Sequence, residues 1–277
     1  MAGTINSNRG FVGSLDLRFG VDEQKRTRLV RRYRTGLFHL SKPYVDGKQL
    51  VVQVVNPTAG IFEGDCLESR IAAGKDACAC VFSPSSTQVY AMPNGGKAHF
   101  RQEVSVAPGA SLAVMPRWLV PHKGARLEQC TRLDVSRGSR LFYVDLISAG
   151  RSGSGEFLQY KELTAAMEIW LGGTIVLKER LSCGANLNRW IWGRGGNQFT
   201  YLGAVYLSFP GCAGELENMA REIGDPSQVM GFTPIDPDLA VIRIAGNSSN
   251  EISSTIKKIS IAAGKWMPVS TVAQRIP

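Results

Sequence analysis

Three carboxylates interrupt segments that are otherwise apolar or rich in glycine, and these side chains are the best placed to do chemistry. Asp65 follows a turn sequence with two glycines, Asp145 ends an apolar run, and four small residues separate Glu156 from Arg151. A buried charge costs several kcal/mol unless it is paired, so each carboxylate should meet an arginine, backbone N–H groups, water or a cation. Structural pairing, for example with Arg151 or Arg180, is the simpler interpretation for any one of them.

No closed catalytic or ligand set accompanies these carboxylates. His39, His99 and His122 lie in unrelated contexts, without H-E-x-x-H or H-x-E spacing, so a fixed metal site built on imidazoles is not expected. The glycine-rich segment 192–197 lacks the Lys-Ser/Thr ending of a phosphate loop, and no serine lies in a G-x-S-x-G elbow. We therefore expect no tightly bound cofactor, and no hydrolase or GTPase activity in the isolated chain.

Two other functional classes compete on single features. Asp145 and Glu156 could form the acid/base pair of a β-helical carbohydrate hydrolase, but no sugar-stacking aromatic residues are grouped around them. The net charge of +9 and the basic segment 25–34 would suit a nucleic-acid-binding protein, but the segment lacks the aromatic interleaving of single-strand binders. We interpret this basic segment as a solvated strand face or a protein-docking patch.

The bulk composition favours one globular domain spanning residues 1–277. A chain that is 44% hydrophobic and 20% charged can bury a large core without being divided. No apolar run approaches the roughly 20 residues of a membrane span, and the N-terminus lacks the pattern of a secretion signal, which predicts a cytoplasmic protein. The six cysteines form no C-x-x-C pair, so we expect buried free thiols.

Short alternating or apolar segments of strand length dominate residues 50 to 207. They include the segments 50–55, 98–106, 111–115, 140–146 and 174–181. Four of the turns share one pattern, in which apolar residues stand three positions before and after a glycine; these glycines are Gly74, Gly109, Gly138 and Gly172. Glycine supplies the positive φ of a tight reversal, and spaced copies of one turn predict a mainly β fold, built as a β-helical stack of hairpins.

Two segments near the C-terminus have helical periodicity instead. Residues 215–223 place Leu216, Met219 and Ile223 on one face, and Ser248 with Glu251 forms a capping box ahead of an apolar stripe. We expect two α-helices that pack against one end of the β body.

The ordered succession of motifs along the chain resembles the urease accessory D family, UreD/UreH. The resemblance spans roughly residues 11 to 245, and its specificity lies in the order of the motifs, because each one alone is short. The matching segments are 56–65 (with Gly60, Gly64 and Asp65), 86–90 (ending in Tyr90), 94–98, 109–112, 115–116, 121–125, Asp145, 150–151 (Gly150 and Arg151), 155–157 (Gly155 and Glu156) and 179–181.

The chain departs from this family pattern at three places. Ala59 replaces the usual second glycine, Ala91 replaces the usual arginine after Tyr90, and the sequence ends Arg275-Ile276-Pro277 without the customary closing motif. The last departure bears on the C-terminal contact surface.

The resemblance implies a β-helical body with two helices that acts beside UreF and UreG and docks on apo-urease. UreE would supply the nickel, UreG would hydrolyse GTP, and this chain would offer a water-filled passage for Ni²⁺. Isolated carboxylates suit such a role, because an ion in transit must be held weakly enough to leave. We therefore place Asp65, Asp145, Glu156, Arg151 and Tyr90 near the passage, with transient Ni²⁺ contact and no nucleic-acid or membrane partner.

Overall fold

The computed structural model describes residues 10–55, 59–184, 198–223 and 227–270. Three segments discussed above therefore lie outside the described residues. They are the start of the first family motif (56–58), the glycine-rich segment 192–197 and the C-terminal departure at 275–277.

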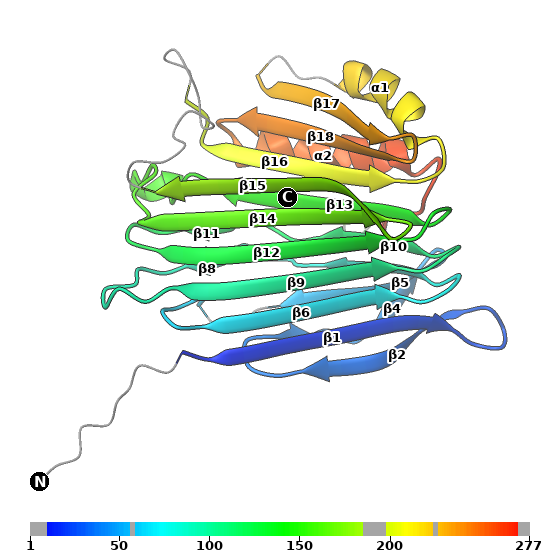
Figure 1. Cartoon of the computed structure of the whole chain (residues 1–277), viewed down its shortest axis with the longest axis horizontal. Coiled ribbons are helices and arrows are strands. Elements are labelled where there is room, and N and C mark those ends of the chain that lie inside the picture. The colour runs from blue at the N-terminus through cyan, green and yellow to red at the C-terminus, as the bar shows by residue number, and fades with distance from the viewer. Residues whose placement is uncertain (1–9, 56–58, 185–197, 224–226, 271–277) are drawn as a thin grey trace, which may run out of the picture.

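The strands form two sheets that face each other (Figure 1). The first sheet has seven strands, in the order β15 (Thr174–Gly184), β14 (Glu162–Leu171), β12 (Arg126–Val135), β9 (Ala98–Val106), β6 (Cys66–Ala73), β1 (Val12–Val21) and β2 (Thr27–Arg34). The main path of the second sheet is β17 (Val229–Asp236), β18 (Leu239–Gly246), β16 (Tyr201–Ser208), β13 (Arg140–Ser148), β10 (Ser111–Met115), β7 (Cys78–Phe82), β5 (Gln49–Val55) and β3 (His39–Leu40). The short strands β4 (Tyr44–Asp46), β8 (Thr87–Val89) and β11 (Leu119–Pro121) pair beside this path.

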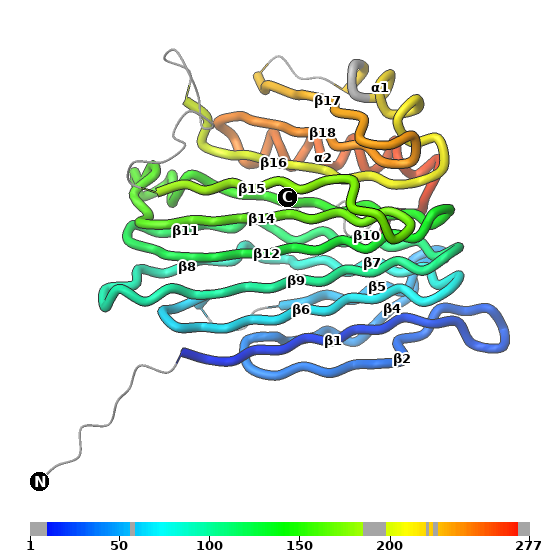
Figure 2. Tube along the Cα trace, viewed as in Figure 1, coloured from blue at the N-terminus to red at the C-terminus, as the bar shows by residue number. Residues whose placement is uncertain are grey.

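The chain alternates between the sheets and so winds as a solenoid, which the trace in Figure 2 follows from bottom to top. Strands β6, β9, β12 and β14 pair in parallel in the first sheet, and β5, β7, β10 and β13 do so in the second. Antiparallel strands close both ends of the first sheet and the β16–β18 end of the second. The predicted mainly β, coiled fold with two helices is confirmed.

The repeated glycine turns are coil corners in three cases and a hairpin in one. The turns at Gly74, Gly109 and Gly138 each join a strand of the first sheet to a strand of the second, whereas Gly172 joins the paired strands β14 and β15. Three of these glycines have positive φ, but Gly74 does not, and Asp76 adopts φ 59° in that turn instead. A Cβ at Gly74 would lie 2.9 Å from the Phe19 carbonyl oxygen, so close packing requires this glycine.

Both predicted helices are present, α1 (Cys212–Ile223) and α2 (Ser249–Ala263), and a short 3₁₀ helix spans Ser152–Ser154. The capping box forms as expected, because the Glu251 N–H donates to Ser248 Oγ at 3.3 Å. The helices lie against β16, β17 and β18 at the upper end of the molecule in Figure 1. Their apolar faces, including Leu216, Ile252 and Ile259, join one core cluster with the second sheet.

The outer face of the first sheet carries a row of alternating charges. The strand register places six side chains side by side, in the order Asp16, Arg70, Glu103, Arg132, Glu168 and Lys178. Strand β2 lies at the edge of this sheet and contains most of the basic segment 25–34. Its Arg28 and Arg31 pair with Asp22 and Asp16, which reduces the local positive charge on which the nucleic-acid interpretation rests.

Candidate functional site

A polar row crosses the inner face of the first sheet. Ser69, Gln102 and Thr131 are register partners on the neighbouring strands β6, β9 and β12. Strand alternation turns them inward, since the next inward neighbours of Ser69 are the buried Leu67 and Ile71. A row of polar side chains therefore runs through the interior from one coil of the solenoid to the next.

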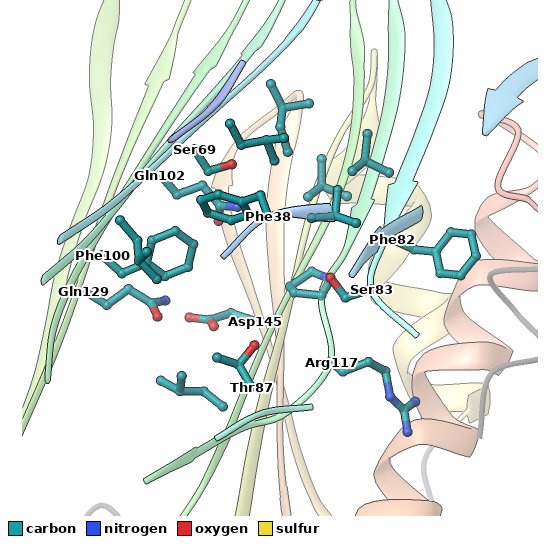
Figure 3. A pocket seen from close by; sticks show the side chains of 18 of the residues that line it. Phe38, Ser69, Phe82, Ser83, Thr87, Phe100, Gln102, Arg117, Gln129 and Asp145 are labelled. Atoms are coloured by element: carbon teal, nitrogen blue, oxygen red, sulfur yellow. The ribbon is translucent and has the colours of Figure 1, made fainter. Parts of the chain in front are cut away.

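An inner cavity of about 110 Å³ opens between the sheets beside this row. Figure 3 shows Gln102, Gln129 and Asp145 directed into it from opposite walls. The Tyr143 hydroxyl donates to Gln102 Oε1 at 2.6 Å, whereas the buried Ser69 Oγ has no partner among the described residues. The rest of the lining is mainly apolar, so the part beside these polar groups is the part that suits ordered water, because one water needs about 10–15 Å³ and a few polar neighbours.

Asp145 is the one carboxylate that lines this inner cavity. Its side chain is only partly exposed. Burial, with a smaller contribution from the nearby Glu179 carboxylate, raises the pKa of Asp145 to about 6, and a hydrogen bond from the Leu146 N–H opposes that rise. The group can thus lose its proton near neutral pH without being locked into an ion pair.

A groove of about 430 Å³ lies on the other side of Asp145, between β15 and the strands β16 to β18. Glu179 lines it and accepts hydrogen bonds from the Tyr206 hydroxyl and the Arg243 guanidinium. Of the residues that the structure describes, Asp145 alone lines both this groove and the inner cavity. The polar interior therefore meets the groove at Asp145.

Several other family positions meet in a loop cluster, which we define as Phe62, Tyr90, His122, Arg151 and Glu156. The Tyr90 ring stacks on Phe62 at 4.7 Å between centroids and contacts the His122 ring at 4.5 Å. Arg151 Nε donates to Glu156 Oε2 at 3.0 Å. Burial, followed by the charge of Arg151, lowers the pKa of His122. The cluster is held together by ring contacts and one ion pair.

Glu156 is fully engaged within this cluster. Besides Arg151, the Lys123 N–H donates to its carboxylate at 3.0 Å. The Arg151 hydrogen bond, supported by that of Lys123, lowers the pKa of Glu156 to about 2. This is the arginine pairing that the sequence left open as the structural alternative.

Asp65 has a comparable structural setting. It is completely buried, and the N–H groups of Phe11 and Phe62 each donate to its carboxylate at 2.8 Å. These bonds tie the approach to β1 to the turn that carries Phe62, whose ring stacks on Tyr90 in the loop cluster. Asp65 thus holds the backbone of Phe11 and Phe62 in place, and through Phe62 it supports the loop cluster.

The four family glycines shape these loops. A Cβ at Gly60 would lie 2.3 Å from the Gln88 carbonyl oxygen, and one at Gly150 would lie 2.6 Å from that of Glu156. Gly64 and Gly155 have φ of 81° and 69°, in the left-handed region that favours glycine. Close packing therefore accounts for Gly60 and Gly150, and positive φ accounts for Gly64 and Gly155.

The structure thus separates the predicted site residues into two groups. Tyr90, Arg151 and Glu156 lie together, with Asp65 beneath them, whereas Asp145 lies apart in the interior. Neither Asp65 nor Glu156 lines the inner cavity or the groove. Because Asp145 and Glu156 share neither space, the geometry gives no support to a paired-carboxylate hydrolase.

Sequence reasoning did not assign site roles to Gln102, Glu179, Tyr206 and Arg243, which contribute to the interior and the groove. One signal was available for Gln102. It occupies an inward position of an alternating strand, where neighbouring inward positions such as Val104 are apolar. The roles of Glu179 and Arg243 depend on contacts between strands that are distant in sequence.

Among the described residues, no group of three or more His, Cys, Asp or Glu side chains is arranged to hold a metal ion. The described helices are all too short or too polar to cross a lipid bilayer. Fold and site together define a β-solenoid protein with an apolar core and an inner cavity into which a few polar side chains point.

Comparison with known proteins identifies the family. The family model for the UreD urease accessory protein matches residues 12–276. The urease accessory protein UreD of Opitutus terrae is 40% identical over 173 residues, 62% of this chain and less than two thirds (63%) of that relative. UreD proteins of Alkalilimnicola ehrlichii and Halalkalibacterium halodurans are each 26% identical over 90% of the chain, and 85% and 93% of their own lengths. The chain belongs to the UreD urease accessory protein family.

Proposed function

We propose that this chain is a scaffold in urease maturation that docks on apo-urease together with UreF and UreG. In this proposal UreE supplies Ni²⁺, UreG hydrolyses GTP, and the present chain works in the cytoplasm without catalysing a reaction itself. Ni²⁺, as cargo, passes through the polar interior of the solenoid. Family membership supports the role in urease maturation.

The position of Asp145 carries the proposal of a passage. Within the described part of the chain it is the one residue common to the inner cavity and the groove, so an ion moving between these spaces would pass its carboxylate. A carboxylate whose pKa is about 6 is ionised at neutral pH and offers one oxygen donor group to a divalent cation. A single donor group cannot trap nickel as a closed site would, which suits transfer.

The experiment compares two aspartates of the same chain. Asp145→Asn removes the charge at the meeting point of cavity and groove, and Asp134→Asn removes an exposed charge that pairs with Arg132 on the outer face. Each variant is co-expressed with UreF, UreG and apo-urease, and both the yield of the purified complex and the nickel content of urease are measured. We expect normal complex yield for both variants, and a severalfold loss of urease nickel for Asp145→Asn alone. Normal nickel loading in Asp145→Asn would remove the passage from the proposal.

A further inference from the structure

A third, smaller hollow of about 40 Å³ lies between the second sheet and α2. Ser83 and Arg117, which follow β7 and β10, line it from the sheet, and Ser253 and Lys257 line it from the helix. Figure 3 shows the Arg117 guanidinium extending away from the inner cavity towards this helix. Two cationic side chains and two hydroxyls therefore surround one small space.

These polar groups lack an acceptor. No carboxylate lines this hollow, and Arg117 Nε and Ser253 Oγ are both buried without a hydrogen-bond partner among the described residues. Burial lowers the pKa of Arg117, and no acidic side chain of the described residues forms an ion pair with it. A partly buried cation without a partner is costly, and an anion would offset that cost.

The backbone holds the sheet side of the hollow in place. The Ser83 N–H donates to the Met115 carbonyl at 3.1 Å, and the Thr87 N–H donates to that of Trp118 at 2.8 Å. These bonds fix the two segments that precede and follow Arg117 against their neighbours. The backbone that carries Ser83 and Arg117 is thus held in place before a ligand arrives, which favours binding.

We propose that this hollow binds a small inorganic oxyanion of the size of phosphate. Arg117 would present two N–H groups to its oxygens, Lys257 would add a second positive charge, and Ser83 and Ser253 would donate from their hydroxyls. The space admits roughly three water-sized groups, which excludes a nucleotide. The bound anion would link α2 to the solenoid and neutralise Arg117, which also lines the inner cavity. This inference goes beyond urease maturation and does not depend on it.

Equilibrium dialysis of the full-length chain with radiolabelled phosphate, at constant ionic strength, tests the proposal. We expect saturable binding of one phosphate per chain, which Lys257→Gln weakens by at least about tenfold, because a charge-assisted contact is lost. Lys258→Gln is the matched control: it is the adjacent exposed lysine of the same helix and does not line the hollow. Ser253→Ala should weaken binding severalfold.

Competition identifies the ligand class. Sulfate should displace the phosphate, and chloride at the same concentration should not. Equal weakening by Lys257→Gln and Lys258→Gln would reduce the effect to general charge attraction and overturn the site, and so would binding that does not saturate. Displacement by chloride as effective as by sulfate would overturn the oxyanion assignment. Arg117→Met should abolish binding. If this variant does not fold, the Lys257 and Ser253 variants on α2 still test the proposal. None of these measurements involves urease.

Discussion

The interior around Asp145 and the loop cluster around Glu156 shift the pKa of a carboxylate in opposite directions. Arg151 and the Lys123 N–H engage Glu156 and lower its pKa to about 2. Asp145 has no cationic partner to lower its pKa, and burial raises that pKa to about 6. One group is stabilised as a charge, and the other is destabilised as a charge.

This difference shows that acidic residues at different motif positions of one family need not share a role. Asp65 and Glu156 hold loops in place, because backbone N–H groups and an arginine use their oxygens. Asp145 contributes little to holding the fold, and its carboxylate faces two hollow spaces. Substitutions should therefore lower stability at Asp65 and Glu156, whereas removing the charge of Asp145 should raise stability and impair the proposed passage of Ni²⁺.

The largest expected effect comes from Asp65→Ala. The change leaves the N–H groups of Phe11 and Phe62 without an acceptor, at about 1–3 kcal/mol each, so the free energy of unfolding should fall by about 2–6 kcal/mol. Urea unfolding at pH 7, followed by circular dichroism, measures it. Asp65→Asn should lose less, because its amide oxygen can still accept one of these bonds. A loss below about 1 kcal/mol in Asp65→Ala would show that the carboxylate is not structural.

Asp145→Asn should act in the opposite direction. Because the folded pKa of about 6 exceeds the ordinary value of 3.8, the native state binds more protons between these pH values, and wild-type stability falls as pH rises through that window. Removing the charge should stabilise the chain by up to about 3 kcal/mol above pH 6 and by little near pH 4. Unfolding curves at pH 4, 5 and 8 give the difference. If the gain in the free energy of unfolding did not vary with pH, ionisation of Asp145 would not be its cause.

Glu156→Gln should have the smallest of the three effects. Its folded pKa of about 2 lies below the ordinary value of 4.5, so its stabilisation is present above pH 4.5 and is lost as the pH falls towards 2. Because the Arg151 side chain is 43% exposed, solvent screening limits the expected loss to about 1–2 kcal/mol at pH 7. Glu168→Gln, which removes an exposed glutamate paired with Lys178, is the control and should change stability much less than Glu156→Gln does. Equal losses in the two variants would erase the distinction between the loop cluster and the surface.

Local sequence signals predicted the local structure well. Alternating segments such as 98–106 became strands over the same residues, and the Ser248 capping box starts α2 where expected. Glycine spacing located the coil corners, although Gly74 serves close packing and not positive φ. These features follow from interactions between residues a few positions apart, so the sequence alone determines them.

The sheets, the hollows and the charge state of each carboxylate depend on residues far apart in sequence. The strands on either side of Gly74, Gly109 and Gly138 could have paired with each other, and only stacking of successive coils places them in separate sheets. Likewise, Asp65, Asp145 and Glu156 look alike in sequence. Their different roles arise because the fold supplies different surroundings: Arg151 pairs with Glu156, two backbone N–H groups donate to Asp65, and Asp145 lines a cavity wall. For Glu156 and Asp145 these surroundings shift the pKa in opposite directions.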